Sequence, residues 1–185
     1  MRKSIPMLLA LPLLLAGCAG GRDGGGLRVR DLGLSEIDGR VVLRPGLALS
    51  LTKPIEQALD NGVAVTILME ARVTRGRDWF WPATEVEKER RYTLLYHSLS
   101  EQYLVRQGGQ TPRAFPSRLA ALAALSNPDP WPLAKTGALA GDGHFRVALR
   151  VSVDLQSLPA PLRLMAYFSP AWHVGSGWQS ENLAP

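Results

Sequence analysis

Apolar and polar residues alternate with a period of two over much of the chain beyond residue 26. The clearest example is residues 144–155, where every second side chain from Phe145 onwards is apolar. Residues 63–73 follow the same pattern, and residues 85–99 and 101–106 extend it. Because the side chains of a strand point alternately to its two faces, this pattern predicts half-buried antiparallel strands.

Turn signals separate these strands. Asp38-Gly39 predicts a hairpin turn between a strand that begins at Leu27 and one at residues 40–51, because both turn residues tolerate positive φ. A turn at residues 76–84 leads to the strand at 85–99. Two further strands are predicted at residues 162–168 and 172–178, after proline-rich breaks. The total is eight or nine strands.

Two segments have helical patterns instead. Thr52 is placed to cap a short helix in which Ile55, Ala58 and Leu59 share one face, and Asn61-Gly62 offers a left-handed stop. Residues 117–126 form the second predicted helix, which ends before Pro128. The chain is therefore expected to be mostly β (α+β), an antiparallel β-sandwich or strongly curved sheet, with one domain at residues 27–185.

The N-terminus has the order of residues found in a bacterial lipoprotein signal. Arg2 and Lys3 precede an apolar stretch at residues 5–16, which is shorter than the roughly 20 residues of a spanning helix. Leu15-Ala16-Gly17-Cys18 follows, with small residues before the only cysteine of the chain. We expect removal of residues 1–17 and attachment of fatty acids, such as palmitate, at Cys18.

The residues after Cys18 indicate in which membrane the protein is anchored and how its folded domain is connected to the anchor. Alanine at position 19, where an aspartate favours retention in the inner membrane, predicts the periplasmic face of the outer membrane. Residues 18–26 are rich in glycine, a composition typical of a flexible tether.

Charge and cysteine content exclude some classes. Processing would leave about 168 residues, which is enough chain for a sizeable core. It would also lower the net charge from +5 to about +3. Arginines are dispersed without long basic runs, so nucleic-acid binding has no compositional support. With Cys18 lipidated no thiol remains, and the fold must form without disulfides.

Several short motifs resemble one family in order and spacing. They are Ala58-Leu59-Asp60-Asn61-Gly62-Val63, Arg75-Gly76-Arg77-Asp78-Trp79-Phe80-Trp81, Leu94-Leu95-Tyr96-His97-Ser98-Leu99 with Gln102-Tyr103, and Leu158-Pro159-Ala160-Pro161-Leu162-Arg163-Leu164 with Trp172. Together they resemble domain of unknown function family 4390, exported proteobacterial proteins without an assigned activity. Such proteins are often encoded beside a membrane sensor kinase, so the resemblance implies a sensor ectodomain as one possible partner.

Catalytic and metal-binding patterns are weak. The chain has no His-Glu-x-x-His and no nucleophile elbow, and its three histidines, His97, His144 and His173, lie in separate predicted strands without paired spacing. We expect surface or strand-edge histidines, no metal and no cofactor. The alternating glutamates at 85, 87 and 89 are expected to face arginines across the sheet.

The segment from Arg75 to Trp81 is the candidate partner-binding site. Its candidate residues are Arg75, Arg77, Trp79, Phe80 and Trp81. Three consecutive aromatic residues cannot all face one side of a strand, and exposed tryptophan beside arginine is typical of binding hot spots. The alternative is that these rings fold back over the end of the sheet. Trp172, Trp178 and Tyr167 are expected in the core or at its edge.

Three function classes remain. The sequence favours a non-catalytic binding or scaffold module attached to a membrane. A carrier of lipids or amphiphiles is the first alternative, and it requires a cavity lined by the apolar faces of residues 63–73 and 145–155. A hydrolase is the second, and it requires a histidine within hydrogen-bond reach of a carboxylate.

Overall fold

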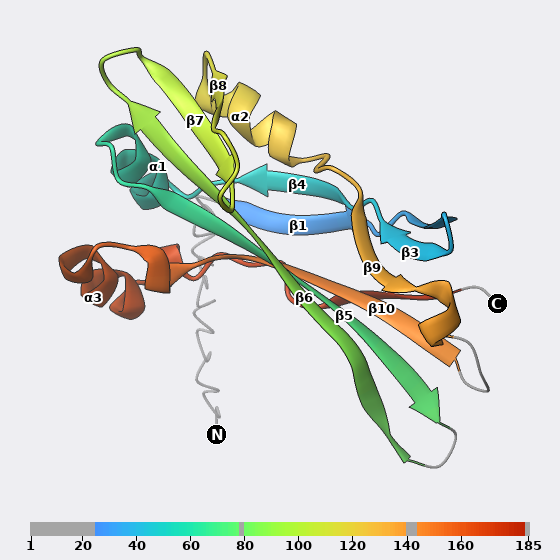
Figure 1. Cartoon of the computed structure of the whole chain (residues 1–185). Coiled ribbons are helices and arrows are strands. Elements are labelled where there is room, and N and C mark those ends of the chain that lie inside the picture. Colours follow the sequence, from blue (N-terminus) through green and yellow to red (C-terminus); the bar gives the residue numbers. More distant parts are fainter. Residues whose placement is uncertain (1–24, 78–79, 140–143, 184–185) are drawn as a thin grey trace, which may run out of the picture.

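The computed structural model describes residues 25–77, 80–139 and 144–183, which form antiparallel sheets and short helices (Figure 1). The strands are β1 (Gly26–Asp31), β2 (Leu34–Ile37), β3 (Arg40–Leu43), β4 (Gly46–Ser50), β5 (Val65–Arg77), β6 (Phe80–His97), β7 (Gln102–Gln107), β8 (Arg113–Phe115), β9 (Trp131–Lys135), β10 (His144–Val153) and β11 (Gln179–Asn182). The helices are α1 (Lys53–Asp60), α2 (Arg118–Leu125) and α3 (Ala160–Phe168), with 3₁₀ turns η1 (Thr136–Leu139), η2 (Leu155–Ser157) and η3 (Pro170–Trp172).

The largest sheet has the strand order β11-β10-β5-β6-β7-β8. Its centre is β5, which pairs with β6 on one side and with β10 on the other over almost its whole length. The apolar rows predicted on β5 and β10 point to one face and are fully or almost fully buried. The period-two alternation therefore located both the strands and the core face correctly.

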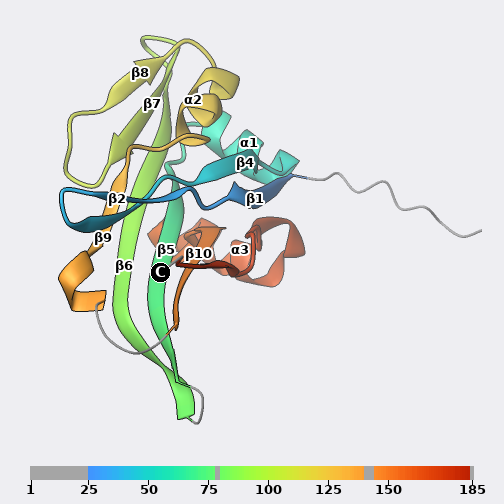
Figure 2. The same cartoon turned by 90° about the vertical axis from the view of Figure 1, so that its right-hand side faces the viewer.

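A narrow ribbon of shorter strands crosses the long strands of this sheet (Figure 2). Its two parts are the β1-β4 pair and the β2-β3-β9 sheet. Leu27 of β1 and Leu47 of β4 are buried in the same core as Ile67 and Leu149 of the large sheet. The ribbon thus forms a second layer over the apolar face.

The Asp38-Gly39 turn is confirmed, but it joins β2 and β3. Both residues have positive φ, 50° and 65°, as a two-residue hairpin turn requires. The predicted strand at 40–51 is interrupted at Arg44-Pro45, and the opposite strand bends at Gly33, whose φ is 45°. Proline cannot donate a ladder hydrogen bond, so β4 leaves the hairpin and pairs with β1.

Both predicted helices are present. Ser117 caps α2, because its hydroxyl accepts a hydrogen bond from the backbone N–H of Ala120 at 3.1 Å. Thr52 occupies the N-cap position of α1 but its hydroxyl donates to the backbone carbonyl of Ala171 at 2.7 Å. At the other end of α1, Gly62 adopts the expected positive φ of 80°.

The C-terminal part differs most from expectation. Residues 162–168, predicted as a strand, form α3, because the prolines at 159 and 161 stand at the start of a helix, where proline fits, and strong helix formers follow. Residues 172–178 contain the end of η3 and one isolated bridge instead of a strand. Strands β8, β9 and β11 were not expected. The mostly-β, α+β class is confirmed, with eleven strands and three α-helices in the described ranges.

Candidate functional site

The predicted partner-binding segment lies at the β5–β6 hairpin. Trp79 falls outside the described residues, and Arg77, Phe80 and Trp81 are described only as strand positions. Arg75 is half-buried: its guanidinium lies 3.3 Å from a carboxylate oxygen of Glu85 and 4.8 Å from the centre of the Phe145 ring. Of the candidate arginines and aromatics, Arg75 is therefore the one whose contacts can be stated.

The predicted lipidation site, Cys18, also lies outside the described residues, as does most of the predicted tether. No helix within the described ranges is long and apolar enough to cross a bilayer.

The histidines have local partners. A ring nitrogen of His97 lies 3.0 Å from the Ser100 hydroxyl, and one of His173 lies 3.0 Å from the Ser169 carbonyl oxygen. His144 is exposed at the start of β10, opposite Gly76. Neither contacted oxygen belongs to a carboxylate, the partner that the hydrolase hypothesis requires. Among described residues, no three His, Cys, Asp or Glu side chains are grouped so as to hold a metal ion.

The polar face of the large sheet carries a ladder of charged pairs. Arg150 of β10 makes a bidentate pair with the buried Glu70 directly opposite on β5, with both N–O distances 2.7 Å. Arg72 of β5 pairs with Glu87 of β6 at 2.8 Å. The expectation that these strand glutamates face arginines is confirmed for Glu85 and Glu87.

Trp178 lies against two of these arginines. The guanidinium of Arg72 is 4.3 Å from its ring centre and that of Arg150 is 4.8 Å away, both within cation–π range. The ring and both arginines remain partly exposed. We call these three residues the Trp178 surface. The expectation that Trp178 lies in the core or at its edge is wrong, because the half-buried ring lies against arginines of the polar face and does not belong to the hydrophobic core cluster. Its pairing with the two arginines depends on the path of the chain after η3.

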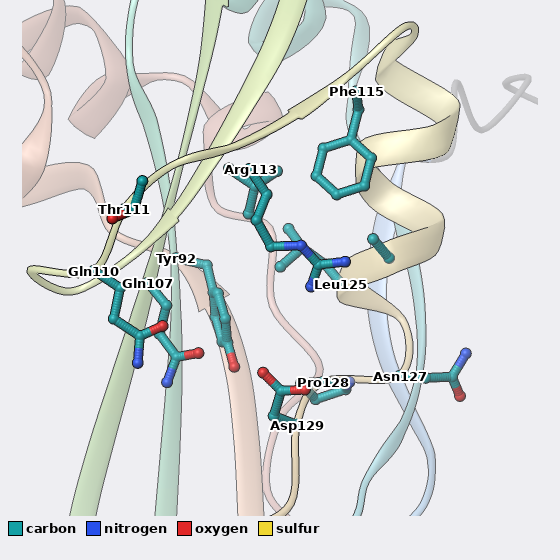
Figure 3. Close-up of a pocket in the computed structure, with 12 residues that line it drawn as sticks. Tyr92, Gln107, Gln110, Thr111, Arg113, Phe115, Leu125, Asn127, Pro128 and Asp129 are labelled. Carbon is teal, nitrogen blue, oxygen red and sulfur yellow. The ribbon is translucent and has the colours of Figure 1, made fainter.

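A small pocket lies between β6, β7, β8 and the segment after α2 (Figure 3). Its volume is about 60 Å³, well below the roughly 300 Å³ of typical ligand pockets. The hydroxyl of Tyr92, which lines it, is buried and has no hydrogen-bond partner among the described residues. Burial raises the pKa of this phenol above its usual value. The pocket has room for ordered water and not for a metabolite.

A wider cleft lies where the described chain begins. It has a volume of about 910 Å³ and is lined by Gly25 and Gly26, the start of α1 and the segment after α3. Arg28, Lys53 and His173 contribute the titratable groups of this lining, and no carboxylate does. The cleft therefore has a cationic lining beside the root of the predicted tether.

The apolar rows of β5 and β10 line none of these pockets; they are packed into one core cluster with the ribbon and helices. The carrier hypothesis requires a cavity between those rows, and no described pocket provides one. Trp172 is buried, as expected, but Tyr167 is exposed on α3, so its predicted place at the core is wrong.

The fold and surfaces define a mostly-β, α+β protein of antiparallel sheets with a charged, tryptophan-bearing face. The chain belongs to the family described as Domain of unknown function (DUF4390), whose model matches residues 25–182. The resemblance inferred from the motifs is thus confirmed. No curated protein and no solved structure matches the chain.

Proposed function

We propose that this protein is a lipid-anchored, non-catalytic binding module on the periplasmic face of the outer membrane. The anchor is Cys18, inferred from the small residues before it and the apolar stretch that precedes them. The Trp178 surface is the part that contacts a partner protein of the envelope, with a sensor kinase ectodomain as the first one to test.

The observation that carries the binding role is the position of the Trp178 ring against two guanidiniums. Tryptophan and arginine dominate interface hot spots because they combine large apolar area with directed polar contacts. The ion pairs of Arg72 with Glu87 and of Arg150 with Glu70 restrict both arginines before binding. A partner therefore meets a surface that loses little side-chain entropy on association.

Crosslinking in the native envelope tests the proposal. Wild-type protein should recover a specific partner, whereas Trp178→Ala and Arg72→Ala should lower its recovery by about tenfold or more, the scale of hot-spot losses. Arg106→Ala is the matched control, because Arg106 is an exposed arginine on β7, away from β5 and β10.

Each variant should retain the wild-type melting temperature to within a few degrees, which separates lost binding from lost folding. Equal recovery by wild type, Trp178→Ala and Arg72→Ala would show that this surface does not contact the partner.

A further inference from the structure

Helix α3 presents apolar side chains outwards. Pro161, Leu164, Met165 and Phe168 recur at i, i+3, i+4 and i+7 and lie on one face of the helix, which we call the α3 stripe. Leu164 is 65% exposed, Met165 70% and Phe168 82%. Ala166 alone among the nine residues of α3 is buried. No element in the described ranges covers the stripe.

The α3 stripe lies close to the point where the described chain begins. A Cβ atom at Gly25 would come within 2.3 Å of the backbone of Leu51 and Thr52, so these segments touch. The hydroxyl of Thr52 donates to the carbonyl of Ala171, which follows Phe168 by three residues. Figure 2 shows the start of β1, α1 and α3 on the same side of the molecule.

The length of the segment between Cys18 and Gly25 limits how far the side of the molecule that carries Gly25 and α3 can lie from Cys18. Seven peptide steps separate Cys18 from Gly25, and they span about 25 Å at most when fully extended. If Cys18 carries lipid, the root of the tether stays within that distance of the bilayer. The α3 stripe, beside the root, is then within reach of the bilayer surface.

The charges around the stripe are compatible with anionic lipid. Residues 155–180 contain no aspartate or glutamate. Arg163, the charged residue of α3, bonds back to the carbonyl of Leu158 through two guanidinium nitrogens. The neighbouring cleft adds Arg28 and His173, again without a carboxylate. Acidic headgroups would therefore meet no like charge on α3 or in the lining of this cleft.

We propose that the α3 stripe docks onto the surface of the phospholipid bilayer that holds the lipid anchor. Its side chains enter the boundary between headgroups and acyl chains, where interfacial helices bury their apolar faces to about 5–10 Å. The lipid supplies attachment, and the stripe fixes which side of the protein faces the membrane. This inference rests on the lipid attachment in the proposed function, though not on the Trp178 surface.

Site-directed spin labelling of the full lipidated chain tests the depth of the stripe. Because the mature chain has no other free thiol, Met165→Cys introduces a single labelling site, and Leu99→Cys, in the exposed β6–β7 turn, gives a matched control. The proteins are reconstituted into vesicles of phosphatidylethanolamine and phosphatidylglycerol. At position 165 the label should gain access to dissolved oxygen and lose access to a water-soluble nickel complex. At position 99 it should stay in water.

A charge in the stripe should reverse this result. Leu164→Glu, added to Met165→Cys, should return the label to water, whereas Leu119→Glu, at an exposed leucine of α2, should leave it buried. A water-exposed label at 165 in vesicles that co-float with the protein would overturn docking while leaving the anchor intact. Loss of co-flotation would overturn the anchor and, with it, the docking. A short distance between the labels of two molecules would assign the stripe to a second copy and also overturn the proposal.

Discussion

At the scale of single residues, Tyr92 has a polar group in an unfavourable, buried position. Its ring is packed at 4% exposure, while its hydroxyl is buried without a partner among the described residues. Tyr92→Phe keeps the ring and removes the unpaired hydroxyl, so we expect it to raise the free energy of unfolding by about 1 kcal/mol. Urea unfolding measures this, and a lower stability for the variant would show that the hydroxyl makes a bond after all.

The same phenol predicts how stability depends on pH. Burial raises the pKa of Tyr92 above 10.0, so the unfolded chain loses this proton at a lower pH than the folded one. The stability it contributes is complete below pH 10 and is lost as the pH rises from about 10 through the folded-state pKa. Tyr92→Phe should therefore lose less stability above pH 10. The pKa of Tyr103 is also raised by burial and by its hydrogen bond to Asp60. Because wild type and variant both contain Tyr103, its contribution to the pH dependence is the same in both and cancels in the comparison.

At the scale of secondary-structure elements, the pairing of β5 with β10 brings the buried carboxylate of Glu70 into contact with Arg150. Glu70 and Arg150 lie opposite each other on β5 and β10. Arg150→Met should lower the free energy of unfolding by about 1–3 kcal/mol, because it leaves the buried Glu70 carboxylate unpaired. The double variant Glu70→Leu with Arg150→Met should recover most of that loss. Urea unfolding of both variants gives the comparison, and a double variant no more stable than Arg150→Met would contradict the explanation.

Helix α1 is joined to η3 by one side chain that the sequence suggests as a cap. The Thr52 hydroxyl donates to the carbonyl of Ala171 instead of bonding within α1. Thr52→Val should therefore cost about 1 kcal/mol by leaving that carbonyl unpaired, while Thr52→Ser, which keeps the donor, should cost less. Thermal unfolding distinguishes the two, and a loss for Thr52→Ser without a loss for Thr52→Val would mean that the methyl group, and not the hydroxyl, matters at this position.

At the scale of the whole molecule, the proposed attachment to the membrane depends on one atom, the sulfur of Cys18. Cys18→Ser should remove incorporation of labelled palmitate and shift the protein from the membrane fraction to the soluble periplasmic fraction, because two or more acyl chains give stable anchoring. Fractionation and metabolic labelling measure both effects. A variant that still sediments with membranes and incorporates label would show that Cys18 is not the anchor.

Much of the fold was predictable where a pattern is local. The alternation in β5, β6 and β10, the positive-φ turn at Asp38-Gly39 and the helix predicted at residues 117–126 each depend on residues close together in the chain. Short edge strands such as β8 and β11 were missed, because three or four residues contain too little alternation to be distinguished from a loop.

The Trp178 surface could not be predicted from the sequence, because its parts come from distant segments. The sequence drew attention to the aromatic run after Arg75, whereas the Trp178 surface needs β5, β10 and the segment before β11 to meet. The sequence also placed Tyr167 in the core, because a strand at 162–168 would have alternated its side chains. Only the helix that forms there turns Tyr167 and the α3 stripe outwards.

By itself, the sequence determined the mostly antiparallel β class, the core face of the long strands and the family, because each depends on patterns within short segments of the chain. The tertiary structure alone decided which arginines contact Trp178, where the Thr52 hydroxyl bonds and which side of α3 is uncovered. These depend on contacts between residues up to 119 positions apart. Such contacts form when the core packs, and no local preference specifies them.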